Sequence, residues 1–440
     1  MPISSGLNND HIRVGIVLPE DQITTLSLAW DSELDVSGSI PGLGTLQKLD
    51  LSLKSGKIQI VAASNIFSVA ELTLTCNDEV EALKTKSGIH LDPVIAGRGF
   101  HWHKQIAVAL PGELKITVEN KALKVINTVA VEAYVACVAT SEMGAEAPAD
   151  LLAAQTIVAR CWSLALAEAK HLAEGFDVCN DDCCQRYQGT SFLTDHSLQA
   201  AIDTKHEVLI YNDQVIDARY SKNCGGMVEA YETVWEGGPV PYLIPLWDAP
   251  NQRPGLAVDD PDDLWNYHDA YCSSKRFESV NLAGMLGKVD VSGSYYRWEQ
   301  LLSKADLLQN LKKYTGHIWQ SLEGIRIMER GASSRIKFLF LEGIDKAGQP
   351  TEQIVRSEYG IRQMFSDSFL YSSAFVIKNA ATLKQDDQIL LRGVGWGHGV
   401  GLCQMGALGM ALTGIEYQAI LNHYYPGTQL SKTTDNLAEI

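Results

Sequence analysis

The chain has 440 residues, of which 46% are hydrophobic and 20% are charged, a composition typical of a globular protein large enough for two domains. Its 36 Lys and Arg residues stand against 53 Asp and Glu residues, which gives a formal net charge of -17. Because an anionic surface repels phosphates, this balance argues against nucleic acid and anionic lipid as partners.

The sequence contains no apolar run long enough to cross a bilayer, so we expect no transmembrane segment. Its first residues, MPISSGLNND, lack the basic start and the apolar stretch of a secretion signal. Two explanations are open at this stage: a cytoplasmic protein, or one whose leader has been removed. Nine cysteines in a chain of this length do not predict a disulfide scaffold.

The first part of the chain alternates short strand-like runs with turn residues. His11–Leu18, Lys57–Ala62 and Glu71–Thr75 are examples of such runs. They predict a β-rich N-terminal module over residues 1–95. The module contains no catalytic constellation, so we expect it to pack on, or to present, the rest of the chain.

The second part begins with a predicted hairpin and two helices. After Gly112 the alternation in ELKITVENKALKVINTV indicates two paired strands. The period then changes, and Val131–Ser141 is predicted to be a helix with Gly144 as its stop. A second helix is expected to begin near Pro148, and its apolar middle predicts burial on most sides.

Strands and helices continue to the C-terminus. Strand-like runs are expected over residues 206–236, Ile325–Met328 and Ile336–Leu341, and helices over Trp298–Tyr314 and Gly401–Leu412. A polar, turn-rich stretch around residues 250–295 is predicted to be an insertion. These elements predict an α+β fold of mixed helices and mainly antiparallel strands, with a second domain over residues 96–440.

The segment Thr-Ser-Glu142-Met-Gly places a carboxyl group at the end of a predicted helix. The negative end of the helix dipole and partial burial both disfavour the charged form of a carboxyl group there. A glutamate that stays protonated near neutral pH can act as the general acid in glycosidic cleavage. Taken alone, a glutamate at a helix end is most often a solvated surface residue.

A glycine occupies every second position in Gly-Val-Gly-Trp-Gly-His-Gly-Val-Gly401. In an extended chain alternate residues share one face, so that face would carry no side chains and would let a backbone or a substrate approach closely. Trp396 and His398 would project from the other face. The alternative is that the glycines only permit tight packing. Tyr220 and Ser221, next to a Gly-Gly turn, could line a sugar groove or belong to an ordinary strand-turn-strand.

The cluster Cys179-Asn-Asp-Asp-Cys183-Cys184, with His171 upstream, has the residue types that bind zinc tetrahedrally. Adjacent cysteines do not match the usual spacing of a zinc motif, so thiols without a metal are the alternative.

Together these segments resemble the SpoIID/LytB family, the group of stage II sporulation protein D and the amidase enhancers. The resemblance covers most of residues 97–430 in five ordered blocks, among them VEAYVACVATSEMGAEAPADLLAAQTIVARCWSLA, DVCNDDCCQRYQG and RGVGWGHGVGLCQMGALGMALTG. It implies a peptidoglycan lytic transglycosylase that cleaves glycan strands, preferably denuded of stem peptides, to anhydromuramic ends. The essential acidic residue of the family falls on Glu142, as general acid and then base.

The resemblance also implies roles for other residues. Gln155 and Arg160 would orient Glu142 or bind the glycan, and Tyr220, Ser221 and His398 match family positions near the groove. It implies a structural zinc ion held by Cys179, Cys183, Cys184 and His171, with Cys183 standing where a histidine is usual and with His171 rather far upstream.

Two further interpretations remain beside the enzyme. One is a non-catalytic enhancer that binds peptidoglycan and stimulates a cell-wall amidase. The other, a zinc hydrolase, is disfavoured because sulfur-rich zinc sites are usually closed. The substrate implies the periplasm or the cell surface as the location.

Overall fold

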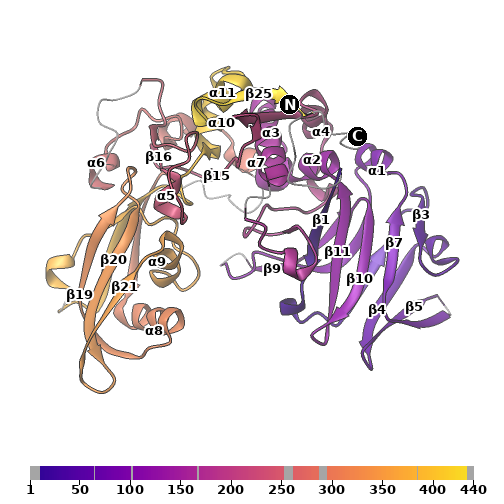
Figure 1. Cartoon of the computed structure of the whole chain (residues 1–440), viewed down its shortest axis with the longest axis horizontal. Coiled ribbons are helices and arrows are strands. Elements are labelled where there is room, and N and C mark those ends of the chain that lie inside the picture. Colours follow the sequence, from indigo (N-terminus) through magenta and orange to yellow (C-terminus); the bar gives the residue numbers. More distant parts are fainter. Residues whose placement is uncertain are drawn as a thin grey trace. The chain divides into compact units, whose positions relative to one another are not determined.

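The structure is a computed structural model that describes residues 10–63, 65–100, 103–165, 168–251, 261–286, 295–383 and 385–433. The chain divides into two compact units (Figure 1). Unit 1 comprises Met1–Asp217, Ala283–Val291 and Gln429–Ile440, and unit 2 comprises Ala218–Leu282 and Ser292–Thr428. The mixture of helices and mainly antiparallel sheets is the predicted α+β fold, with a β-rich N-terminus.

The first sheet of unit 1 has the strand order β12-β1-β11-β10-β7-β3. Its strands are β1 (His11–Val17), β3 (Val36–Gly38), β7 (Leu72–Cys76), β10 (Glu113–Glu119), β11 (Ala122–Ala130) and β12 (Val178–Cys179). Strand β1 pairs antiparallel with β11 and parallel with the short β12, so β1 lies between segments distant in sequence. The β10–β11 pair is the hairpin predicted after Gly112.

The second sheet of unit 1 has the order β6-β5-β4-β2-β8-β9. Its strands are β2 (Thr25–Ala29), β4 (Lys48–Lys54), β5 (Lys57–Ala62), β6 (Asn65–Val69), β8 (Ile89–Ala96) and β9 (Lys104–Leu110). The boundary predicted at residue 95 falls inside β8, which pairs with β9 beyond it. Because both sheets join strands from either side of residue 95, residues 1–95 do not form a unit of their own.

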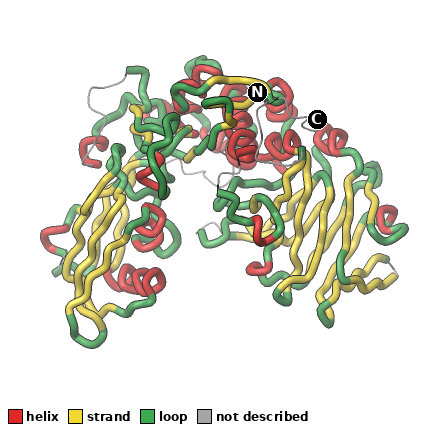
Figure 2. The backbone as a smooth tube through the Cα atoms, viewed as in Figure 1, coloured by secondary structure: helices red, strands yellow, loops and turns green. Residues whose placement is uncertain are grey.

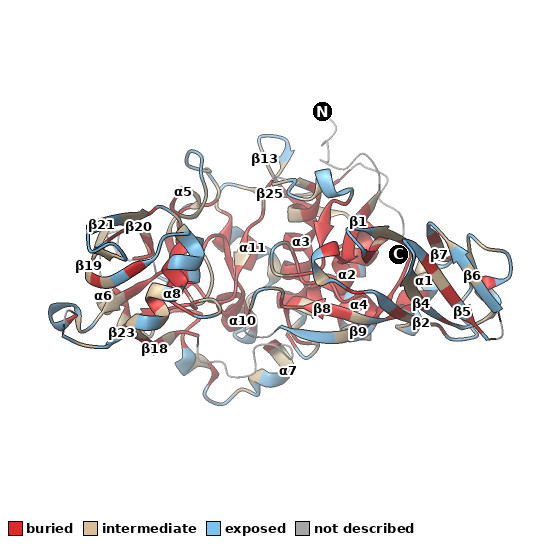
Figure 3. Ribbon diagram, turned by 90° about the horizontal axis from the view of Figure 1, so that it is seen from below, coloured by how far each residue is buried: buried red, intermediate tan, exposed pale blue. Residues whose placement is uncertain are grey.

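Helices complete unit 1, together with a small sheet in the order β14-β13-β25. These elements are α1 (Glu79–Thr85), α2 (Val131–Glu142), α3 (Ala149–Ala165), α4 (Asp195–Asp203), β13 (Glu207–Tyr211), β14 (Gln214–Val215) and β25 (Gln429–Lys432). Both predicted helices are confirmed, with α2 ending one residue later than expected. All of α2 except Ser141 is buried, and α3 is buried along most of its length (Figure 3).

Unit 2 contains two antiparallel three-stranded sheets that share one hydrophobic core with two helices (Figure 2). Their strands are β18 (Arg297–Ser303), β19 (Trp319–Arg330), β20 (Ile336–Asp345), β21 (Pro350–Val355), β22 (Phe375–Ile377) and β23 (Gln388–Val394), and the helices are α8 (Lys304–Thr315) and α9 (Glu358–Met364). Trp298, Leu341 and Phe375 are among the buried residues of this core.

The remainder of unit 2 is built from short elements. They are β15 (Tyr220–Ser221), β16 (Met227–Val228), α5 (Tyr231–Val234), β17 (Leu246–Trp247), α6 (Pro261–Trp265), β24 (Leu402–Cys403), α10 (Gln404–Leu412) and α11 (Tyr417–Tyr424). Strand β15 pairs parallel with β24, and β16 pairs antiparallel with β17. The helix predicted over Gly401–Leu412 is present as α10, but it begins only at Gln404.

Two predictions need correction or fall partly outside the structure. The segment Trp298–Tyr314 is not one helix, because its first part is strand β18 and only its second part is α8. The insertion predicted around residues 250–295 lies partly outside the described residues, which include α6 and α7 (Leu282–Leu286) from that stretch. Among the described helices, none combines the length and the apolar character that crossing a bilayer requires.

Candidate functional site

Glu142 is the last residue of α2, as predicted, and only 8% of it is exposed. Its Oε1 atom accepts a hydrogen bond of 2.9 Å from the backbone N–H of Arg186. Two residues later, the N–H of Gly144 donates to the carbonyl of Met285 in α7 over 2.9 Å. The end of α2 is thus held between the loop after β12 and a helix from the predicted insertion, and the carboxyl group is fixed in orientation.

The loop that holds Glu142 also carries the predicted metal ligands. Within it, the Arg186 guanidinium binds Asp182 through Nε and Oδ1, 2.8 Å apart. Burial raises the pKa of Asp182 to about 7; Arg186 opposes this shift, and the neighbouring carboxyl groups of Asp181 and Glu142 add to it. Arg186 therefore contacts Glu142 through its backbone and the cysteine-bearing turn through its side chain.

Side chains from outside the loop hold it in place. The Asp181 carboxylate accepts hydrogen bonds of 3.0 and 2.7 Å from the backbone N–H groups of Gly97 and Arg98, just after β8. On the side of α2, the hydroxyl of the fully buried Tyr134 donates to the Gln185 side chain over 3.0 Å. These contacts join the loop both to the second sheet and to the helix that ends in Glu142.

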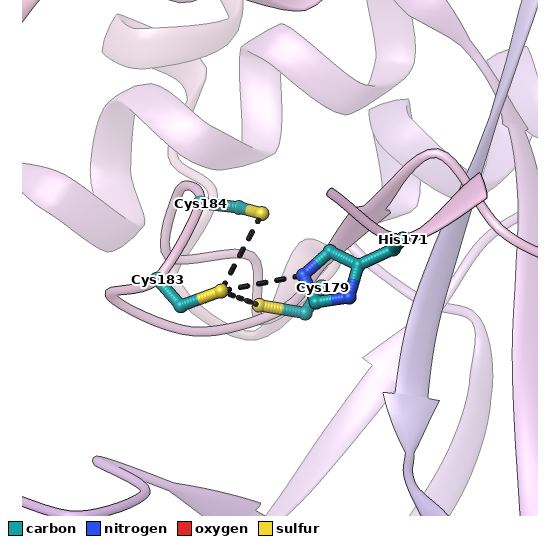
Figure 4. A group of neighbouring side chains, drawn as sticks. All are labelled: His171, Cys179, Cys183 and Cys184. Carbon is teal, nitrogen blue, oxygen red and sulfur yellow. Dashed lines mark hydrogen bonds between the residues drawn. The ribbon is translucent and has the colours of Figure 1, made fainter. Parts of the chain in front are cut away.

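The predicted zinc ligands lie together (Figure 4). One ligand atom from each of His171, Cys179, Cys183 and Cys184 lies within 4.8 Å of the others. The Sγ atom of Cys183 is 3.3 Å from His171 Nε2, 3.4 Å from Cys179 Sγ and 3.8 Å from Cys184 Sγ. Tetrahedral zinc with Zn–S bonds of about 2.3 Å places sulfur atoms about 3.8 Å apart, so the four residues fit this metal.

The surroundings of this cluster also suit a metal. The other ring nitrogen of His171, Nδ1, is 3.1 Å from a Glu174 carboxylate oxygen, the usual arrangement that orients a ligating imidazole. Hydrogen bonds with the thiols of Cys179 and Cys184, together with the nearby His171, lower the pKa of Cys183. Although His171 is distant in sequence, the short 3₁₀ turn over Leu172–Glu174 folds it back to the cysteines.

Arg160 has a different role from the one expected. Its guanidinium is fully buried and binds Glu132 through two hydrogen bonds, Nε to Oε1 over 2.8 Å and Nη2 to Oε2 over 2.6 Å. A third bond of 3.0 Å joins Nη1 to the Glu207 carbonyl. Gln155 is also fully buried in α3. Neither side chain is exposed to a glycan, and the Arg160 guanidinium bonds to Glu132 rather than to Glu142.

The alternating glycines lie in unit 2, and only the first of them, Gly393 in β23, is in an extended strand; the later ones are not extended, contrary to the prediction. Gly397 and Gly401 have φ values of +96° and +71°, the left-handed region that favours glycine. The close approach of another backbone is nonetheless present. Trp396 exchanges two backbone hydrogen bonds with Asn223, and a Cβ atom on Gly401 would overlap the carbonyl oxygen of Arg219. The glycines let two segments of this chain pack together.

The other predicted substrate residues also lie in unit 2 and are partly or mostly buried. The Trp396 ring packs edge-on against Tyr295 and Tyr371, with centroids 4.2 and 5.2 Å away. His398 packs edge-on against Trp235, with centroids 4.8 Å apart. Dehydration of the His398 ring, with the positive charge of Arg219 next in effect, lowers its pKa well below the usual value, so the ring is neutral.

Tyr220 and Ser221 form β15, and Ser221 is 7% exposed. The predicted residues therefore separate into two groups. Glu142, Gln155, Arg160 and the metal ligands belong to unit 1, and the other four belong to unit 2.

One buried cluster was not predicted. Cys224, Asp248, Cys272 and Cys403 come together in unit 2, with one ligand atom of each within 4.8 Å of the others. No short motif joins them, since the gaps between successive members exceed the spacing of ordinary zinc motifs. Only the tertiary structure brings these four side chains together.

One family model covers the segment of unit 1 that contains the candidate site. Residues 119–211, which contain Glu142 and the cluster of His171, match the family model described as "Stage II sporulation protein". Residues 229–401 match a model described as "Domain of unknown function (DUF8618)". The chain thus carries a SpoIID-type domain, in which a helix-terminal glutamate adjoins a thiolate and imidazole cluster. Over these residues it is similar to the SpoIID/LytB family.

Three relatives are similar over most of the chain. An uncharacterized protein of Brachyspira hyodysenteriae is 27% identical over 80% of this chain and 82% of its own length. The "Stage II sporulation protein D" of Bacillus subtilis is 25% identical over 72% of this chain and 79% of its own. The "Amidase enhancer" of the same organism is 28% identical over 66% of this chain but only 39% of its own length.

Proposed function

We propose that this protein is a peptidoglycan lytic transglycosylase with Glu142 as its single general acid and base. The family implies a function in cell-wall processing. The observation that carries the finer proposal is the setting of Glu142: a nearly buried carboxyl group at a helix end, oriented by the Arg186 N–H. A side chain held in this way is suited to proton transfer at one defined atom.

The proposed reaction needs one carboxyl group. Glu142 donates its proton to the bridging oxygen as the glycosidic bond breaks, and the leaving sugar departs with that proton. The carboxylate then accepts the proton of the primary hydroxyl of the muramic acid, whose oxygen bonds to the anomeric carbon. The result is an anhydromuramic end with no net addition of water, so the second carboxyl group of an ordinary glycosidase is not required.

Zinc is proposed as a structural ion at the cluster of Cys179, Cys183, Cys184 and His171. Four protein ligands would leave no open position, which is the arrangement of a structural site. The ion would cross-link the turn that precedes Arg186. In this proposal the chain's own residues position Glu142. The Arg186 N–H orients its carboxyl group, and the Arg186 guanidinium donates a hydrogen bond to Asp182.

A second candidate function is a non-catalytic enhancer that binds peptidoglycan and stimulates a cell-wall amidase. The observation that favours it is the name of one relative, the "Amidase enhancer" of Bacillus subtilis. In both proposals the partner is the glycan strand and the location is the periplasm or the cell surface.

Mass analysis of purified, denuded glycan strands after incubation with the protein tests the proposal. The expected products carry anhydromuramic ends, and Glu142→Gln abolishes them. Glu146→Gln is the matched control, because this exposed glutamate lies four residues further along the same segment. Intact denuded strands with the wild-type protein, together with faster release of stem peptides by an added amidase from peptidoglycan that still carries them, would reject the enzyme and support the enhancer.

A further inference from the structure

Unit 2 contains a second set of metal-binding side chains, separate in sequence and in unit from the cluster of His171. Cys224 lies between β15 and β16, Asp248 directly follows β17, and Cys272 lies in the loop after α6. Cys403 ends β24 and caps the N-terminus of α10. Cys224, Cys272, Cys403 and Asp248 are each 0% exposed. Four segments therefore meet at one buried point, each contributing one ligand atom.

The spacing of these atoms fits a metal rather than a disulfide. The Sγ atoms of Cys224 and Cys272 are 3.6 Å apart. A disulfide needs about 2.05 Å between sulfur atoms, whereas two thiolates on one tetrahedral zinc lie about 3.8 Å apart. With Cys403 and Asp248 included, all four ligand atoms lie within 4.8 Å of one another, the separation expected around a single ion.

Hydrogen-bond donors surround the cluster as they do in thiolate metal sites. The Sγ atom of Cys403 accepts from the backbone N–H groups of Cys224 and Gly406, over 3.2 and 3.3 Å. The Asp248 carboxylate accepts from the Cys272 N–H over 3.0 Å and from the Tyr424 hydroxyl over 2.6 Å. Such donors fix the ligands and offset the negative charge that remains when thiolates and a carboxylate bind a divalent ion.

The packing around the cluster leaves no room for a side chain at Gly406. A Cβ atom on Gly406 would overlap the Tyr424 hydroxyl oxygen and lie 2.6 Å from Asp248 Oδ1. Helix α10 can approach the carboxylate only because this position is glycine. A divalent cation bound here would balance the negative charge of a buried carboxylate beside thiolates.

We propose that Cys224, Asp248, Cys272 and Cys403 form a second, structural metal site for a divalent zinc-class ion. Three sulfur ligands and one carboxylate oxygen suit zinc better than the hard cations magnesium and calcium, which prefer oxygen ligands alone. The ion would cross-link four segments, three of which adjoin strands of only two residues each, namely β15, β16, β17 and β24. This inference does not depend on the proposed enzymatic activity.

Counting the metal ions in the intact protein tests the proposal. Inductively coupled plasma mass spectrometry on wild-type protein should find two zinc ions per chain. Cys272→Ser should lower this value two-fold by emptying the site in unit 2, and Cys179→Ser should do so by emptying the cluster of His171. Cys76→Ser, which changes a buried cysteine outside both clusters, should retain both ions.

A second measurement covers the case in which Cys272→Ser does not fold. Anomalous difference density at the zinc edge, from a crystal of the unaltered protein, should show a peak among the four proposed ligands. The proposal is overturned if the wild-type protein holds only ions that Cys179→Ser removes. Absence of an anomalous peak at these ligands, or a disulfide between Cys224 and Cys272, would overturn it as well.

Discussion

The buried pair of Glu132 and Arg160 provides a quantitative test of how the helices of unit 1 are held together. Both side chains are 0% exposed, and Arg160→Met removes two hydrogen bonds to Glu132 and one to the Glu207 carbonyl. The Glu132 carboxylate would keep a 3.3 Å contact with the His206 N–H but would have lost its countercharge. An uncompensated charge in such a position costs about 3–5 kcal/mol of unfolding free energy.

Urea unfolding followed by circular dichroism measures this cost. Glu132→Gln should cost a similar amount, because it leaves the guanidinium unpaired, whereas the double variant with Arg160→Met should cost less than either single change. The coupling between the two sites is expected to be about 3 kcal/mol. If Arg160→Met changed stability by less than about 1 kcal/mol and instead weakened glycan binding, the structural role assigned to this arginine would be refuted.

The other predictions concern the metal cluster and the glycine tract. Cys179→Ser should lower the Tm more than it lowers turnover per folded molecule; loss of turnover at an unchanged Tm would contradict a structural ion. Gly401→Ala should destabilise far more than Gly414→Ala, because both have positive φ but only Gly401 meets a backbone carbonyl. Gly414→Ala should lower the free energy of unfolding by about 1 kcal/mol, measured by thermal unfolding. Equal losses at the two sites would contradict the close approach of Gly401 to the Arg219 carbonyl.

Local patterns predicted the elements around Glu142 well. The change from alternation to helical spacing after Ala130 is a strong signal, and the structure changes from β11 to α2 at that residue. The same approach failed over Trp298–Tyr314, where strand and helix are both amphipathic. The boundary could have been found from Ser303, whose side chain caps α8 by accepting from the Asp306 N–H.

Long-range partners explain the remaining errors. Nothing near Arg160 in the sequence indicates that Glu132 faces it across two helices, so its burial as an ion pair could not be derived. The glycine tract predicted close packing but not its left-handed backbone, which follows from the partner segment around Asn223. The four ligands in unit 2 are likewise joined only by tertiary structure.

The central claim is that Glu142 promotes attack by a hydroxyl group of the sugar rather than by water. Cleavage of denuded glycan strands in water enriched in heavy oxygen, followed by mass spectrometry of the new ends, separates the two reactions. The account predicts anhydromuramic ends that contain no heavy oxygen and that disappear with Glu142→Gln. Reducing ends labelled with heavy oxygen, or products that persist in the variant, would contradict it.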